Sequence, residues 1–222
     1  MSDLDEITPD DELIDRLAAN ATGTTVDDEP LRYVLRCSPF IQQSLAAEPA
    51  ILDYVLAGCH DDFLGDGIEK RFSGLSGSRE KRLALDATDF GRELRRLRRR
   101  EMILIAWRDL LGIDDTDATL RSLSRLADFC VAEGLAYHEH HLQARFGQPR
   151  DPEGNPVGLV VVGMGKLGGD ELNYSSDIDL IFAYASEGET DGRKTLSNAE
   201  YFIRLGQRLI RSLDEVTGHG FV

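Results

Sequence analysis

Apolar residues recur at helical spacing over most of the first two thirds of the chain. Four segments share this period and show almost no strand-like alternation: residues 39–47, 49–57, 78–111 and 116–146. Gly112 and Gly147 each follow such a segment, at a position where a left-handed helix end favours glycine. The glycine-rich residues 65–77 predict a surface loop between helices. We therefore predict a helical region that extends to about Gln148.

A stretch dense in proline, glycine and aspartate marks a change of pattern. Residues 148–156 read QPRDPEGNP, and a helix cannot continue through them. This stretch is the best candidate for a domain boundary. We predict an all-helical N-terminal region in residues 1–150 and a second domain in residues 151–222.

The second domain combines strand and helix patterns. Residues 157–162 form an apolar, β-branched run typical of a buried strand, and residues 177–185 (DIDLIFAYA) predict a second strand. Residues 197–216 return to helical spacing. One stripe of that helix carries its apolar side chains: Phe202, Leu205, Leu209 and Leu213. The predicted fold class is therefore α+β.

The charge balance and the cysteines narrow the function classes. The 222 residues include 25 Lys and Arg against 40 Asp and Glu, a net charge of −15, so the average surface repels nucleic acid and anionic membranes. The acidic N-terminus is unlike a secretion signal, and no apolar run approaches the roughly 20 residues that span a bilayer. Three cysteines without a Cys-x-x-Cys pair argue against a disulfide framework and a zinc site. We expect a soluble, cytoplasmic protein with no nucleic acid and no membrane as partner.

A glycine motif follows the first predicted strand. Residues 160–169 (VVVGMGKLGG) contain G-x-G-x-x-G, which alone suggests a dinucleotide-binding turn. A Rossmann unit also needs a helix of about a dozen residues after the last glycine and an acidic residue at the far end of the next strand. Here only residues 170–176 separate Gly169 from the next strand, and the acids stand at its beginning. The spacing therefore argues against dinucleotide binding.

Asp177 and Asp179 are the strongest candidates for chemistry. Residues i and i+2 of a strand point to the same face, so both carboxylates are expected to project into one site. Two like charges held so close require a cation, and Mg²⁺ prefers carboxylate and phosphate oxygens. The alternative is that these are simply two acids at the exposed start of a strand.

A glycine turn followed by D-x-D is the signature of the polymerase β-like nucleotidyltransferases. The wider run of residues 163–182 (GMGKLGGDELNYSSDIDLIF) resembles the bifunctional glutamine synthetase adenylyltransferases. Those cytosolic enzymes carry two such domains in tandem, which add AMP to a tyrosine of glutamine synthetase or remove it. The NYSS sequence before the acids resembles the N-terminal, adenylyl-removing copy. Residues 38–45 and 94–112 also resemble the family's helical leader, so the resemblance extends from about Leu31 onward.

The resemblance implies a phosphorolysis, in which inorganic phosphate attacks the phosphorus of adenylyl-tyrosine and releases tyrosine and ADP. It also implies that Asp177 and Asp179 are catalytic and hold Mg²⁺. Nucleotide-binding roles are implied for four further residues: Gly168, Gly169, Ser176 and Lys166. The implied partners are glutamine synthetase, ATP or ADP, phosphate and, as a further candidate, the PII signal protein.

The sequence departs from the family pattern in two ways. Asp170 stands where many relatives have a basic residue, which adds negative charge beside the site. The family also has a third catalytic carboxylate on the strand after the helix, and this sequence ends at Val222 as that strand is expected to begin. We therefore expect an inactive, truncated nucleotidyltransferase domain with apolar surface near Val160 and Ile181 open to water.

Two other functions stay open from the sequence. One is a relative of the uridylyltransferase that modifies the PII protein, and the other is a non-catalytic interaction fragment.

Three other features of the sequence have a structural rather than a functional interpretation. The arginine-rich residues 92–100 are predicted to form the solvated face of a helix whose other face is buried. Trp107 is predicted to lie in the core. Because the H-E-x-x-H spacing is absent, residues 138–141 (HEHH) predict surface histidines.

Overall fold

The computed structural model describes residues 11–20, 28–60 and 67–214. These residues belong to two compact units. The first, here called the helical unit, comprises the described residues of 1–65 and 100–119. The second, the mixed unit, comprises those of 66–99 and 120–222. Along the chain, helices give way to the first strand between Phe146 and Pro149, and the domain boundary at residue 150 stays a prediction.

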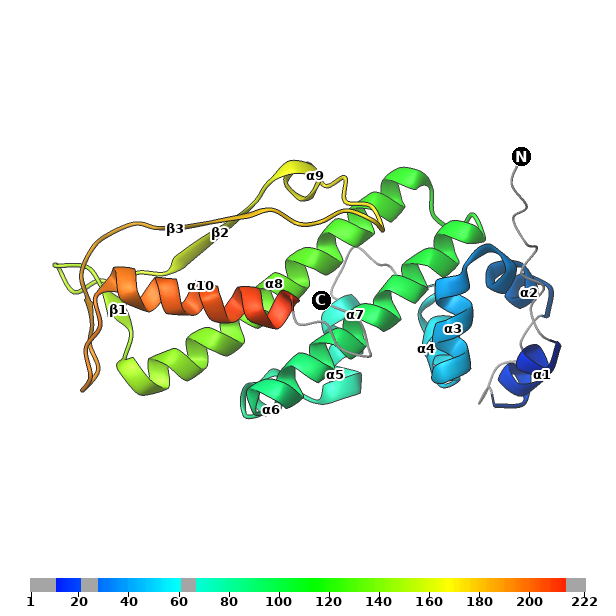
Figure 1. Ribbon diagram of the computed structural model, residues 1–222, viewed down its shortest axis with the longest axis horizontal. Helices are drawn as coiled ribbons and strands as arrows, with labels where there is room; N and C mark the ends of the chain where they lie inside the picture. The colour runs from blue at the N-terminus through cyan, green and yellow to red at the C-terminus, as the bar shows by residue number, and fades with distance from the viewer. Residues whose placement is uncertain (1–10, 21–27, 61–66, 215–222) are drawn as a thin grey trace. The chain divides into compact units, whose positions relative to one another are not determined.

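Within the described ranges, the helical unit contains four short helices near the start of the chain, labelled in Figure 1, whose apolar stripes are buried. In chain order they are α1 (Asp11–Asn20), α2 (Asp28–Cys37), α3 (Pro39–Ala47) and α4 (Ile51–Gly58). The Ser38 hydroxyl caps α3 by accepting from the Ile41 N–H at 3.3 Å. Trp107, in the later segment of this unit, is buried as predicted, and Arg108 pairs with Asp114 at 2.6 Å.

Helices dominate the mixed unit. They are α5 (Gly67–Ser76), α6 (Arg79–Leu83), α7 (Ala87–Leu110, in this unit up to residue 99), α8 (Thr116–Phe146, in this unit from residue 120) and α10 (Asn198–Asp214).

Gly112 and Gly147 have φ angles of 66° and 80°, which confirms the predicted left-handed helix ends. Across the described residues, no helix is both long and apolar enough to cross a membrane.

Two helix predictions were wrong. Residues 67–76 form α5 rather than a loop, because Ile68 and Phe72 lie one turn apart and are both buried. The single helix predicted over residues 78–111 is divided into α6 and α7. The division falls at Asp86, whose carboxylate accepts from the Asp89 N–H at 2.8 Å and caps α7.

Buried charge was also missed by the sequence interpretation. The Arg82 side chain is 1% exposed and donates to Glu133 and Glu69 at 3.0 Å, with its guanidinium over the Phe72 ring. On α7, Phe90 and Leu94 are buried as predicted, but Arg95 is buried as well rather than solvated. Buried guanidinium groups are stable only when they are bonded to acceptors, which explains the Arg82 network.

The strands form two antiparallel pairs. The short pair joins β1 (Pro149–Arg150) to β4 (Glu189–Thr190), and the longer pair joins β2 (Leu159–Gly163) to β3 (Leu180–Tyr184). The short helix α9 (Gly165–Gly168) follows β2 directly. A Rossmann unit would place consecutive strands parallel, so the antiparallel register confirms the argument against dinucleotide binding.

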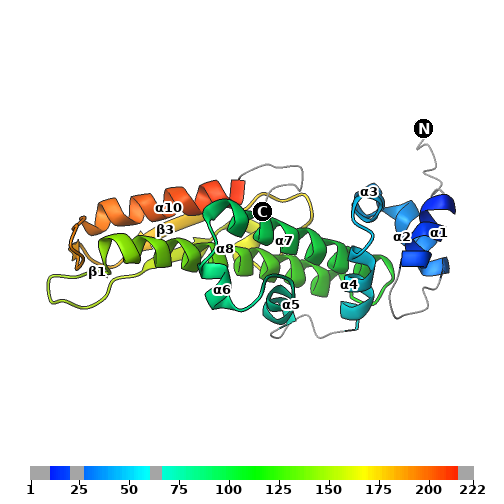
Figure 2. The same cartoon turned by 90° about the horizontal axis from the view of Figure 1, so that it is seen from below.

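The β2–β3 hairpin packs one face on helices and exposes the other. On the inner face, Val161 and Phe182 contact the core that Leu209 and Leu213 of α10 form with α8. Figure 2 shows β3 beside α8 and α10. The apolar stripe predicted for α10 is therefore confirmed. The outer face of the hairpin, defined by Val160, Val162, Ile181 and Ala183, is exposed, with Val160 at 55% and Ile181 at 51%. The predicted strand at residues 157–162 is thus half-exposed rather than buried, and apolar surface near Val160 and Ile181 is open as expected.

Candidate functional site

Asp177 and Asp179 lie in the extended segment that leads into β3. The assigned strand begins at Leu180, three residues later than predicted, but the Met164 N–H donates to the Asp179 carbonyl at 2.8 Å and extends the pairing by one step. Exposure alternates along the segment. Asp177 and Asp179 are exposed, whereas Ile178 and Leu180 pack partly buried on the core. Both acids therefore belong to the outer face of the hairpin.

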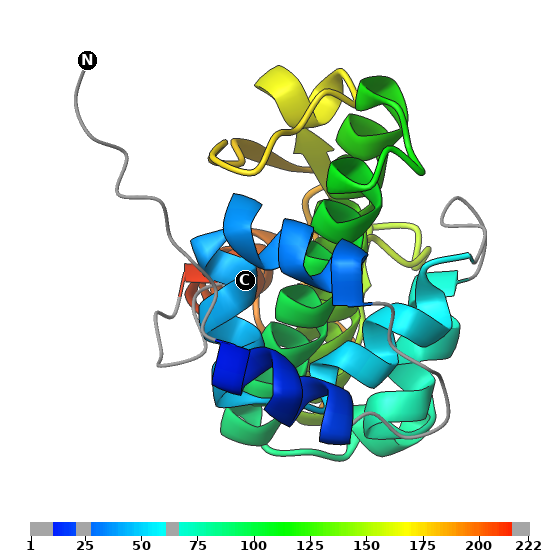
Figure 3. The same ribbon diagram turned by 90° about the vertical axis from the view of Figure 1, so that its right-hand side faces the viewer.

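The glycine turn lies against these acids. Gly165 has a φ of 57°, a left-handed conformation that favours glycine. A Cβ atom built at Gly165 would lie 3.9 Å from the Asp179 Oδ2 atom, so that carboxylate faces the turn. Figure 3 shows α9 and the following loop beside the early turns of α8 in the mixed unit, where the Leu172 N–H donates to the Ser124 hydroxyl at 3.0 Å.

The two predicted nucleotide-binding glycines differ in their surroundings. A Cβ atom on Gly168 would lie 2.6 Å from the Gly163 carbonyl oxygen, whereas one on Gly169 would meet nothing closer than 3.7 Å. Their N–H groups already donate within the turn, to Met164 at 3.3 Å and to Lys166 at 3.2 Å. Gly168 is thus required by close packing of the turn on β2, and Gly169 is not.

Lys166 and Ser176 are brought together although ten residues separate them. The Lys166 ammonium donates to the Ser176 hydroxyl at 3.1 Å, and that hydroxyl donates to the Asn173 side-chain oxygen at 2.5 Å. The same oxygen accepts from the Ser175 N–H at 3.2 Å. Asn173 therefore organises the loop before the acids, a role that the sequence interpretation did not assign. The signal was available, because asparagine followed by serines is typical of such side-chain-closed turns.

The electrostatics of this region favour a cation. Residues 163–182 contain Asp170, Glu171, Asp177 and Asp179 but a single basic residue, Lys166. Asp170 adopts a φ of 57°, which aspartate tolerates better than most residues. Burial and then the nearby Asp170 raise the pKa of the Asp128 carboxyl on α8. Negative charge therefore accumulates along this edge of the mixed unit.

The donor chemistry fits Mg²⁺ held by two protein carboxylates. Asp177 and Asp179 supply hard oxygen atoms on one exposed face, and this ion commonly takes one or two carboxylates together with substrate phosphate oxygens. Within the described ranges, no group of three or more His, Cys, Asp or Glu side chains is placed to hold a metal ion.

One further prediction needs correction. His138 is 5% exposed and so is not a surface histidine. Its ring nitrogen Nε2 lies 2.7 Å from the Ser212 hydroxyl of α10, a contact across 74 residues that no local pattern reveals. Cys37, Cys59 and Cys130 all lie within the described residues, and none of them forms a disulfide bond there.

The fold and the site define an α+β protein with paired carboxylates and a glycine turn on one antiparallel hairpin. Comparison with known proteins makes the assignment specific. The model of the glutamate-ammonia ligase adenylyltransferase (GlnE) family matches residues 29–222. This chain belongs to that family, and the resemblance carried by residues 163–182 is confirmed at that level.

Individual relatives share one name, bifunctional glutamine synthetase adenylyltransferase/adenylyl-removing enzyme. The protein from Thioalkalivibrio sulfidiphilus is 58% identical over 139 residues, which cover 63% of this chain and 14% of the relative. The protein from Shewanella frigidimarina is 36% identical over 205 residues, 92% of this chain and 21% of the relative. The protein from Xanthomonas campestris is 38% identical over 205 residues, which cover 92% of this chain and 20% of the relative. The chain therefore spans about a fifth or less of the length of these curated relatives.

Proposed function

We propose that this chain is part of a magnesium-dependent nucleotidyltransferase that removes AMP from adenylyl-tyrosine of glutamine synthetase by phosphorolysis. The observation that carries the proposal is the pair of exposed carboxylates, Asp177 and Asp179, on one face beside a glycine turn. The names of the relatives, which combine adenylyltransferase and adenylyl-removing activities on glutamine synthetase, support the same target. The proposed fold of residues 151–222 is the polymerase β-like nucleotidyltransferase fold.

Each residue of the site has a distinct role in this proposal. Asp177 and Asp179 would hold Mg²⁺, which when bound supplies charge neutralisation on the non-bridging phosphate oxygens. Lys166 adds a positive charge that Ser176 holds in place at 3.1 Å. Gly168 keeps the turn close to β2, and Gly169 leaves room for a phosphate group to approach the backbone.

The reaction is a displacement at phosphorus. An oxygen of inorganic phosphate forms a bond to the phosphorus of adenylyl-tyrosine, the bond from that phosphorus to the tyrosine oxygen breaks, and the tyrosine oxygen takes up a proton. The products are ADP and unmodified tyrosine. Binding phosphate and substrate in line on one face is the main contribution that the protein makes in such transfers. Addition of AMP from ATP, regulation through the PII protein and a cytoplasmic location are proposed for the enzyme as a whole.

The test measures ADP release from adenylylated glutamine synthetase in the presence of phosphate and Mg²⁺. It uses the chain itself and a chimera in which the chain replaces the aligned residues of the Shewanella frigidimarina relative. We expect Asp177→Asn and Asp179→Asn each to lower ADP release by the chimera about 100-fold or more, because a lost metal ligand costs several kcal/mol. Glu171→Gln, which removes an equal charge from an exposed neighbouring position, is expected to have little effect. Undiminished release by either aspartate variant would overturn the site assignment.

A further inference from the structure

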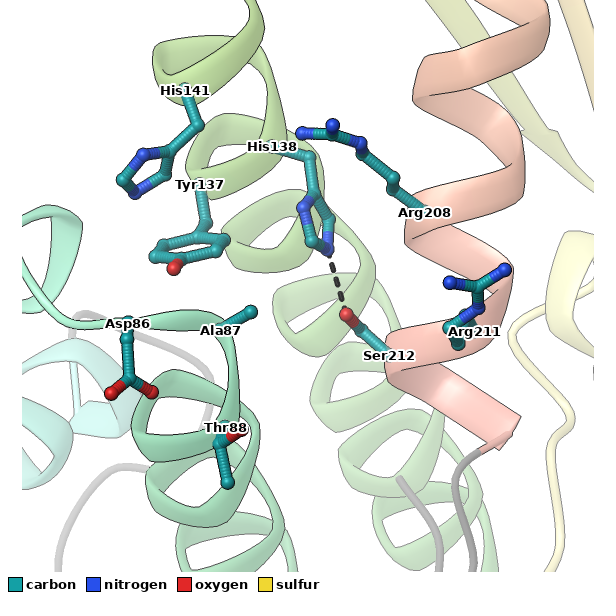
Figure 4. Close-up of a pocket in the computed structure, with 9 residues that line it drawn as sticks. All are labelled: Asp86, Ala87, Thr88, Tyr137, His138, His141, Arg208, Arg211 and Ser212. Carbon is teal, nitrogen blue, oxygen red and sulfur yellow. Dashed lines mark hydrogen bonds between the residues drawn. The ribbon is translucent and has the colours of Figure 1, made fainter.

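A pocket in the mixed unit, away from Asp177 and Asp179, is lined by residues of α7, α8 and α10 and by Asp86, which directly precedes α7. It has a volume of about 550 Å³ and lies between the start of α7, the later half of α8 and the end of α10 (Figure 4). Volumes of this order are typical of sites for small molecules. None of the residues that line the pocket belongs to the site around Asp177 and Asp179.

Two arginines of α10 line this pocket without a counter-ion. Arg208 and Arg211 have no carboxylate within ion-pair distance in the part of the chain that the structure describes. Arg204, one turn earlier on the same helix, does pair with Glu200. In a chain with 40 acidic residues against 25 basic ones, two arginines that line one pocket form a local positive exception.

The histidine side of the pocket offers polar atoms that lack a complete set of partners. The His138 ring contacts the Ser212 hydroxyl at 2.7 Å, and both side chains line the pocket. Burial, then Arg208 and then His141, lowers the pKa of His138 to about 4, so its ring is neutral near pH 7. When the neutral ring donates to the Ser212 oxygen, the hydroxyl proton of Ser212 is free for a ligand. The Nε2 atom of His141 is buried and has no hydrogen-bond partner among the described residues.

The acidic residue at the pocket does not neutralise the arginines. Asp86 caps α7 through its bond to the Asp89 N–H, and Figure 4 places it across Tyr137 from Arg208. The Tyr137 hydroxyl donates to the Leu85 carbonyl at 2.8 Å and is therefore already engaged. The positive charge thus lies on α10, beside the neutral ring of His138, and the negative charge stays at the α7 rim.

We propose that this pocket binds a phosphate group, free or carried by a small molecule, through Arg208, Arg211 and the Ser212 hydroxyl. Guanidinium groups match phosphate oxygens with paired hydrogen bonds, and a hydroxyl donor completes such a set. The volume exceeds that of one phosphate, so an organic body has room beside it. The proposal does not depend on the function proposed above, because the two sites share no residue.

The test follows the histidine signals of the chain by NMR during titration with inorganic phosphate and, separately, with AMP. His138 is identified by the loss of its signal in His138→Gln. A bound phosphate group places negative charge beside His138, so we expect its pKa to rise by about one unit or more, while the signal of His60 stays unchanged. At least about tenfold tighter binding of AMP than of phosphate would identify a phosphate carried by an organic body, and equal affinities would identify free phosphate.

Variants decide where the ligand binds. Arg208→Gln combined with Arg211→Gln is expected to abolish the response, and Arg208→Lys, which keeps the charge but loses the planar fork, to weaken it. Arg193→Gln removes an equal charge from an exposed loop position and is expected to leave the response intact. Asp177→Asn is also expected to leave it intact, which separates this pocket from the candidate catalytic site. The proposal is overturned by the absence of any response at His138, or by a response that persists in the double arginine variant.

Discussion

The packing of Gly168 against β2 leads to a quantitative prediction for Gly168→Ala. The new Cβ atom would lie 2.6 Å from the Gly163 carbonyl oxygen, so backbone must move by about 0.4 Å or more to restore a tolerable contact. Overpacking of this kind costs about 1–3 kcal/mol, partly offset by the smaller entropy of the unfolded alanine chain. We expect a net loss of about 1–2 kcal/mol in the free energy of unfolding.

The neighbouring glycine provides the matched control. A Cβ atom on Gly169 would meet nothing closer than 3.7 Å, and its φ of −96° suits alanine. Gly169→Ala is therefore expected to change the free energy of unfolding by less than about 1 kcal/mol, in either direction. The two variants make the same chemical change at adjacent positions, so that a difference between them isolates the contact with Gly163.

Two measurements check this prediction. In thermal unfolding, a loss of about 1–2 kcal/mol corresponds to a fall in Tm of about 2–8 °C for a protein of this size. Hydrogen exchange reports locally: the Met164 N–H, which donates to the Asp179 carbonyl, is expected to exchange faster in Gly168→Ala and unchanged in Gly169→Ala. Equal stability and exchange in the two variants would refute the packing argument.

Three further predictions concern the helices of the mixed unit. Arg82→Met removes the buried partner of Glu133, which keeps only the half-exposed Arg79 at 3.2 Å, and is expected to cost about 3 kcal/mol in chemical denaturation, whereas adding Glu133→Leu is expected to recover most of that loss. Because the folded pKa of His138 is about 4, below its ordinary 6.5, the unfolded chain binds more protons between these values and stability falls as pH is lowered through this window. Allowing for partial solvent screening, we expect this contribution to the free energy of unfolding to be about 1–3 kcal/mol. It is measured by comparing how the free energy of unfolding changes with pH in the natural chain and in His138→Gln. Parallel curves for the two proteins would contradict the prediction. Gly134→Leu is expected to separate α8 from α10, because even a Cβ atom there would lie 2.8 Å from a methyl group of Leu209. A lower Tm in thermal unfolding is the expected result.

Local patterns were sufficient for some of the helices, including α3 and α8, and for the orientation of the acids. The period of apolar residues gave α3 and α8 their bounds, and the glycines at 112 and 147 marked helix ends, because both signals are carried by neighbouring residues. The alternation around Asp177 and Asp179 likewise depends only on the extended backbone.

Features that depend on partners distant in the chain could not be predicted from the sequence. Arg82 is buried because Glu133, 51 residues away, accepts from it. His138 is buried by its contact with Ser212, and the loop before the acids is held by Ser124 of α8. Periodicity assigns such polar residues to the surface, since it contains no information about which charge or hydroxyl will meet them in the folded chain.

The register of the hairpin has a consequence for how the length of this region can vary. Val161 pairs with Phe182 and Gly163 with Leu180, and side chains alternate between the two faces with a period of two residues. Deleting Leu180 would move the preceding residues by one position along the strand, turn the carboxylates of Asp177 and Asp179 inward against the apolar core and bring Ile178 out to water. Insertions in residues 170–175 lengthen a loop and leave this alternation unchanged. The length of the chain can therefore vary before Ser176 but not between Asp177 and the paired strand. The spacing of the acids from that strand determines whether their carboxylates face water or the apolar core.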